Sequence, residues 1–69
     1  MEAEIWGRRI RAYRKLKGYT QEGLAKTLGV SVSVLGEVER GNRIPSDRMV
    51  RDIARTLNLT MEELSPPKE

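Results

Sequence analysis

Apolar positions recur along this chain at intervals of three and four residues, with polar and charged positions between them. Such spacing places apolar side chains on one face of an α-helix. The pattern occurs in five segments, each bounded by residues that can begin or end a helix. We expect helices at about 3–17, between Thr20 and Gly29, at 32–40, from Ser46 to about Leu57, and from Thr60 to about Leu64. The sequence therefore predicts an all-α fold, a compact five-helix bundle.

The first expected helix has an apolar stripe and a charged remainder. Ile5 or Trp6, Ile10 and Tyr13 make up the stripe, with Leu16 as a further candidate. Gly18 follows as the expected end of this helix. A stripe of this width predicts one face packed against the rest of the bundle.

Residues 20–41 are the most informative stretch, because two short helical stripes are separated by a tight turn. Thr20 and Ser31 each precede a stripe, and a hydroxyl there can accept a hydrogen bond from a free backbone amide. Gly29 and Gly41 each follow a stripe and can take the positive φ that ends a helix. The positions expected to be buried in this unit are Leu24, Ala25, Leu28, Leu35 and Val38.

One part of this stretch also fits another element. From Val30 to Leu35 apolar and polar residues alternate, and valine favours β-strands. Read alone, this segment is a candidate strand. No other part of the chain alternates in this way to pair with it, and a helix accounts for Leu35, Val38 and Gly41 together.

Composition narrows the class of protein. Sixty-nine residues suffice for one domain, and the chain contains neither cysteine nor histidine. Thiolate catalysis and the common zinc sites are thereby excluded, and we expect no metal and no cofactor. Glu37 and Glu39 lie two apart on one expected helix and point in different directions, so they do not form a catalytic pair. We expect a non-enzymatic, cytoplasmic protein without a membrane span or a signal peptide.

The positive charge of the chain is concentrated near its beginning. Residues 1–19 contain six Lys and Arg against two Glu, whereas residues 20–45 contain three against three and residues 46–69 four against five. Such a concentration is expected where that end of the molecule faces a polyanion. Taken by itself, it also fits a solvated surface that keeps the protein in solution.

The stretch at residues 20–41 resembles the helix-turn-helix of the phage repressor and Cro family, also called the XRE family. The resemblance extends upstream to Arg9 and downstream to Leu64, which is nearly the whole chain. It implies a lambda-repressor-like bundle whose third helix lies in the major groove of DNA. The matching residues within the stretch are Thr20, Gln21, Leu24, Ala25, Leu28, Gly29, Val30, Ser31, Leu35, Val38, Glu39 and Gly41.

The resemblance implies a set of contacts with double-stranded DNA. The third helix would present its outward residues to the bases, and basic and amide side chains around it would contact phosphates. The expected base contacts are Val32, Ser33, Gly36 and Glu37. The expected phosphate contacts are Thr20, Gln21, Arg40, Asn42, Arg43, Arg9 and Arg11. Arg14 and Glu39 match a pair that forms a structural salt bridge in relatives.

The resemblance implies a transcriptional regulator, most simply a repressor, that binds an inverted-repeat operator as a homodimer, which we expect to be weak or DNA-induced. We expect a DNA-binding domain at residues 1–64 and a disordered tail or the start of a linker at residues 65–69. One alternative is an antitoxin-like or adaptor module that uses the same fold for protein assembly. Another is a basic amphipathic segment at membranes, which would require an unburied stripe on the first helix.

Overall fold

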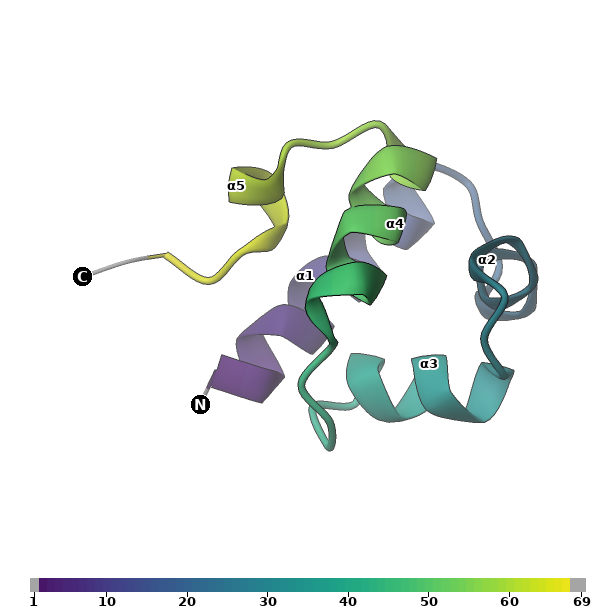
Figure 1. Ribbon diagram of the computed structural model, residues 1–69, viewed down its shortest axis with the longest axis horizontal. Coiled ribbons are helices and arrows are strands. Elements are labelled where there is room, and N and C mark those ends of the chain that lie inside the picture. Colours follow the sequence, from purple (N-terminus) through teal and green to yellow (C-terminus); the bar gives the residue numbers. More distant parts are fainter. Residues whose placement is uncertain (1, 68–69) are drawn as a thin grey trace.

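The computed structural model describes residues 2–67 and contains five helices in this range, with no strand among them. Their order is α1 (Glu2–Leu16), α2 (Gln21–Leu28), α3 (Val32–Glu39), α4 (Asp47–Leu57) and α5 (Met61–Leu64). Figure 1 shows α3 across the lower part of the molecule, α1 and α4 through its middle, α2 at the right and α5 at the upper left. The all-α fold is confirmed, and the alternating segment from Val30 to Leu35 lies mostly in α3 rather than in a strand.

Four of these helices, α2 to α5, have a capping side chain at the N-terminal residue that the sequence predicts. The hydroxyl of each cap residue accepts a hydrogen bond from the backbone amide three residues further on, which satisfies a donor that has no partner within the helix. The caps and their amides are Thr20 with Gly23, Ser31 with Val34, Ser46 with Met49, and Thr60 with Glu63. The Glu63 carboxylate in turn accepts a hydrogen bond from the Thr60 backbone amide, which completes a capping box.

Glycines make the turns that follow α2 and α3. Gly29 ends α2 with a φ of 73°, and Gly41 ends the turn after α3 with a φ of 82°. Side chains with a Cβ rarely adopt this left-handed conformation. The turn between α2 and α3 therefore depends on Gly29, and the turn after α3 depends on Gly41.

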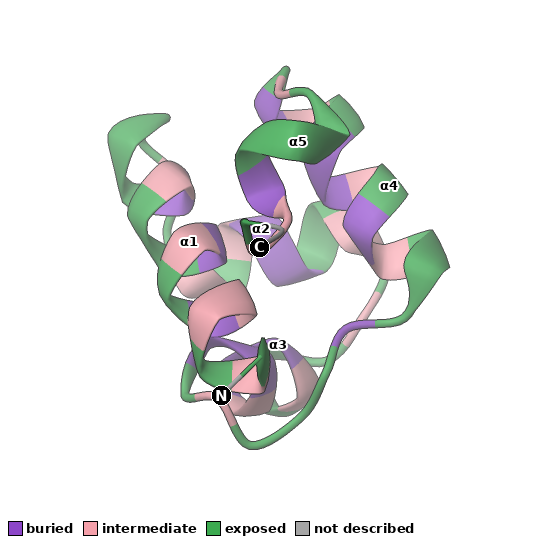
Figure 2. Cartoon of the chain, turned by 90° about the vertical axis from the view of Figure 1, so that its left-hand side faces the viewer, coloured by how far each residue is buried: buried purple, intermediate pink, exposed green. Residues whose placement is uncertain are grey.

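The core is built from all five helices. Figure 2 shows their buried faces turned toward one another. The buried apolar residues are Ile10, Leu24, Ala25, Leu35, Val38, Val50, Ile53, Ala54, Leu57 and Leu64. Because Ile10 is fully buried and Trp6 and Tyr13 pack against this core, the stripe of α1 is not open to lipid. No described helix is long and apolar enough to cross a membrane.

The structure corrects two details of the sequence-based expectation. Leu16 is 75% exposed, because six residues beyond Ile10 correspond to about 240° of helix rotation. Arg40 caps α3 and is not its last helical residue. At the start of the expected tail, Ser65 and Pro66 are half-buried, and the Ser65 hydroxyl donates to the Met61 carbonyl. The disordered tail or linker stays a prediction. The expectation for residues 68–69 lies outside the described residues.

One glycine brings α1 and α3 unusually close together. Gly7 is buried, and a Cβ at this position would lie 2.3 Å from the Val38 carbonyl oxygen and 2.7 Å from that of Glu39. Both obstacles are backbone atoms, so neither can turn aside as the end of a side chain could. The absence of a side chain at Gly7 therefore allows α1 to cross directly against the C-terminal end of α3.

Candidate nucleic-acid interface

The N-terminal end of α3 is the most accessible part of that helix. Val32 is 40% exposed and Ser33 is exposed, whereas Leu35 and Val38 are fully buried. Ser31 fixes the start of the helix by accepting from the Val34 amide at 3.1 Å. The structure thus places Val32 and Ser33 on an outer surface, with the opposite face of α3 in the core.

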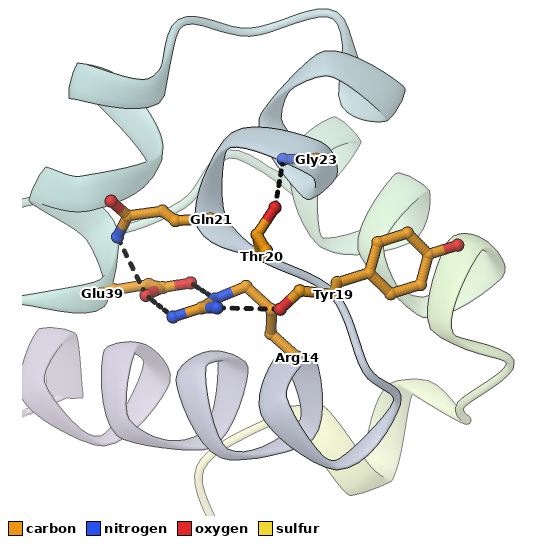
Figure 3. Close-up of polar contacts among 6 residues, drawn as sticks. All are labelled: Arg14, Tyr19, Thr20, Gln21, Gly23 and Glu39. Carbon is orange, nitrogen blue, oxygen red and sulfur yellow. Dashed lines mark hydrogen bonds and ion pairs between the residues drawn. The ribbon is translucent and has the colours of Figure 1, made fainter.

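A buried ion pair fixes the other end of α3 to α1. Arg14 donates from Nε to Glu39 Oε2 at 2.7 Å and from Nη2 to Oε1 at 3.0 Å. The third nitrogen, Nη1, donates to the Tyr19 carbonyl at 2.9 Å. The side chains are only 9% and 3% exposed, and Figure 3 shows the two planar groups facing each other. The ion pair expected from the resemblance is present. Each buried charge is compensated by its partner, whereas an unpaired buried charge would destabilise the fold.

The start of α2 is attached to this pair. Gln21 Nε2 donates to Glu39 Oε1 at 3.1 Å, while the Thr20 hydroxyl accepts from the Gly23 amide at 2.9 Å (Figure 3). One carboxylate therefore links α1, α2 and α3. Thr20 and Gln21 lie at the helix end where free amides and the helix dipole favour an anion.

Gly36 is not exposed, contrary to the expectation from the sequence. It is buried because the guanidinium of Arg40 lies over it. A Cβ at Gly36 would be 3.0 Å from Arg40 Nη1 and 3.7 Å from Gln21 Nε2. Sequence spacing places Gly36 on the outer face correctly, but it does not reveal that a side chain one turn away covers it. A base can reach Gly36 only after Arg40 has moved.

Two further expected contacts are paired with each other. Arg43 donates from Nε to Glu37 Oε1 at 2.9 Å, and Arg43 Nη2 lies 2.8 Å from the same oxygen. Both side chains remain accessible, at 54% for Arg43 and 40% for Glu37. The pair reduces the repulsion that Glu37 alone would exert on phosphates, and it orients Arg43 alongside α3.

The basic residues of α1 point in two directions. Arg11 lies beside Arg40 and Asn42 at the end of α3, as expected for a strip of phosphate contacts. Arg9 does not belong to this strip, because its Nη1 donates to the Glu63 carbonyl at 2.9 Å. Since α5 and α3 lie toward opposite ends of the molecule in both views, this contact turns Arg9 away from α3 (Figures 1 and 2). The neighbouring Arg8 lines the strip instead.

A short helix with an accessible N-terminal end, set across a glycine turn from a second helix and flanked by basic side chains, defines the helix-turn-helix class. The chain belongs to the helix-turn-helix family, whose pattern it matches over residues 10–64.

Similarity to individual proteins agrees with this assignment. The chain is 68% identical over 69 residues to YazB, an uncharacterized HTH-type transcriptional regulator of Bacillus subtilis, and the match covers all of both chains. It is similar to the crystal structure of the restriction-modification controller protein C.AhdI from Aeromonas hydrophila, with 37% identity and a TM-score of 0.84 over 90% of this chain and 94% of that one. It is also similar to SinR, a master regulator for biofilm formation, solved in complex with DNA. That likeness has 36% identity and a TM-score of 0.78, and it covers 84% of this chain and 97% of SinR.

Proposed function

We propose that this protein is a transcriptional regulator that binds double-stranded DNA with α3 in the major groove. The observation that carries the proposal is the accessible end of α3 at Val32 and Ser33, held in place by the buried Arg14–Glu39 pair at its other end. Val32 suits apolar contact with a thymine methyl, and the Ser33 hydroxyl can bond a base edge. Neither is a strong discriminator, so DNA shape contributes to specificity.

Phosphate contacts on both sides of α3 supply most of the affinity in this proposal. The helix end at Thr20 and Gln21 faces one strand, and basic and amide groups follow α3 on the other side. The residues proposed for this second group are Arg11, Arg40, Asn42 and Arg43.

We further propose that the operator is an inverted repeat bound by a homodimer that is weak or forms on DNA. Two-fold symmetry of a dimer would place half-sites about one helical turn apart. Sedimentation without DNA should show mostly monomer at micromolar concentration, and a tight dimer would contradict this part of the proposal.

Selection of bound duplexes from a random DNA pool tests the proposal and returns the half-site with its spacing. The affinity for a selected duplex should then fall linearly on logarithmic axes as salt rises. Four to six phosphate contacts correspond to a slope of about −4 to −5 per bound domain. A slope near zero, or no enriched sequence, would favour the adaptor alternative.

Two variants separate base recognition from phosphate binding. Ser33→Ala should change the preference at one or two base pairs, by about 1 kcal/mol or less, and leave the salt slope unchanged. Arg40→Ala should weaken binding to selected and scrambled duplexes alike and lower the slope by about one. If both variants kept the wild-type ratio of specific to non-specific affinity and the wild-type slope, α3 would not be the reading helix.

A further inference from the structure

A hollow between α1 and the end of α3 gathers basic side chains from both elements. It is lined by Glu4, Arg8, Arg11, Glu39, Arg40 and Asn42. Arg8 and Arg11 are three residues apart on α1, so they lie on one face of that helix. Arg40 and Asn42 approach from the other side, immediately after α3. The hollow therefore combines two segments that are far apart in the sequence.

Gly7 explains why these segments meet. With no Cβ in the way of the Val38 and Glu39 carbonyls, α1 lies directly against the last turn of α3. The exposed Arg8 is adjacent to Gly7, and it is thereby brought to the end of α3. A larger residue at Gly7 would separate the two groups of basic side chains.

The side chains that line the hollow carry a positive formal charge once the Arg14–Glu39 pair is set aside. Glu39 is neutralised by Arg14, which leaves three guanidinium groups, those of Arg8, Arg11 and Arg40, against Glu4. Three positive charges and one negative charge give a net charge of +2. Within the described part of the chain, no ion pair uses any of these three guanidinium groups. They are accessible donors with a geometry that suits phosphate oxygens.

We propose that this hollow binds one phosphate group and that Arg8 is one of its binding residues. The phosphate is a backbone phosphate of DNA, so the inference rests on the proposed function. Arg11 and Arg40 reach the same group from the two sides of the hollow. Arg9, one residue away from Arg8, has no part in it, because it is bonded to the Glu63 carbonyl near α5.

Arg8 and Arg9 provide a matched pair of variants, since each removes one positive charge from the same turn of α1. We expect Arg8→Ala to weaken binding about five-fold to a selected and a scrambled duplex alike, and to lower the salt slope by about one. Arg9→Ala should keep the wild-type slope. Circular dichroism would verify that both variants are folded. Equal slopes for Arg8→Ala and the wild type, or equal losses from both variants, would overturn the proposal.

Glu4→Gln tests the same hollow by removing a negative charge instead of a positive one. Removing the acidic group should raise affinity for both duplexes, by about two- to five-fold, because its repulsion of the phosphate is lost. A decrease in affinity would contradict a phosphate at this position.

Titration of the wild type with inorganic phosphate distinguishes a failure of this inference from a failure of the proposed function. The side-chain NMR signals of Arg8, Arg11 and Arg40 should shift together, and that of Arg9 should not. If they shift while DNA fails to bind, the hollow binds phosphate and the DNA-binding proposal is wrong. If DNA binds with its expected slope but Arg8 responds to neither ligand, the hollow is not a phosphate site and the wider proposal stands.

Discussion

Two ion pairs use neighbouring glutamates of α3 and differ almost entirely in their surroundings. Glu39 faces inward and binds two nitrogens of Arg14 with both carboxylate oxygens, at side-chain exposures of 3% and 9%. Glu37 faces outward and binds Arg43 through one oxygen, at exposures of 40% and 54%. The residue types are the same, and the two glutamates are two positions apart.

The difference shows how one short helix is both fixed in the fold and available to a partner. The buried pair is further bonded to Gln21 and to the Tyr19 carbonyl, so it connects three helices (Figure 3). The exposed pair has no such network, and water competes with it at every atom. We therefore expect the first pair to determine stability and the second to affect DNA binding.

Removing one partner of each pair should give the largest contrast. Arg14→Ala leaves Glu39 buried without compensation, which should lower the free energy of unfolding by about 3 kcal/mol. Arg43→Ala, the matched control, should lower it by less than about 1 kcal/mol, because exposed pairs contribute little. Chemical denaturation of both variants provides the measurement. Similar losses would show that burial does not distinguish the pairs.

Gly7→Ala should disturb the buried ion pair without removing a charge, because it displaces α1. The added methyl group meets two backbone carbonyls, so the helices must separate at a cost of about 2–3 kcal/mol. The separation should loosen the Arg14–Glu39 pair and leave Arg43–Glu37 intact. NMR signals of the four side chains would test this: those of Arg14 and Glu39 should change and those of the other two should not.

Gly36→Ala serves as the control for that substitution. A methyl group there meets only Arg40 and Gln21 side-chain atoms, of which the nearest, at 3.0 Å, is the end of a flexible chain. Alanine is also the better helix former, by about 0.5–1 kcal/mol. The free energy of unfolding should therefore stay within about 1 kcal/mol of the wild type. A loss as large as that of Gly7→Ala would mean that helix propensity and packing had been misjudged.

The contrast between these two glycines also explains what the sequence could and could not predict. Helix starts were predicted correctly because a cap such as Thr20 or Ser31 acts on an amide three residues away. The close contact at Gly7 depends on carbonyls more than 30 residues further along the chain. The residues around Gly7 therefore do not predict this contact. A glycine inside an otherwise well-formed amphipathic helix was the available signal.

The candidate DNA contacts were predicted from their positions along each helix. Where the structure differs, as at Arg9 and Gly36, the reason is the direction in which a side chain points. Arg8 and Arg9 are adjacent residues of the same type, yet Arg9 points to α5 and Arg8 points to the end of α3. Gly36 lies on the expected face but is covered by Arg40. The Arg14–Glu39 pair was anticipated from the family resemblance, since charge signs alone would also have allowed other partners for either residue.

A smaller effect concerns DNA affinity. Glu37→Gln removes a negative charge from the outward face of α3 and releases Arg43, so affinity for a scrambled duplex should rise by about two- to five-fold. The same change two residues on, Glu39→Gln, should reduce stability and give no such gain. Fluorescence anisotropy with a labelled duplex would measure both. A loss of affinity for Glu37→Gln at every sequence would show that Glu37 serves mainly to hold Arg43 in place.

The smallest effect is the response of each pair to salt, and it tests the comparison most directly. Double-mutant cycles, Arg14→Ala with Glu39→Ala and Arg43→Ala with Glu37→Ala, isolate the coupling energy of each pair. At low salt the exposed pair should show a coupling of about 0.5 kcal/mol, which should approach zero near 1 M salt, where the Debye length is about 3 Å. The buried pair excludes the ions that would screen it, so its coupling should change little over the same range. If both couplings declined in parallel, the carboxylate of Glu39 would be reached by solvent ions as readily as that of Glu37, and the attachment of α3 to α1 would have to come from the contact at Gly7 and the apolar core.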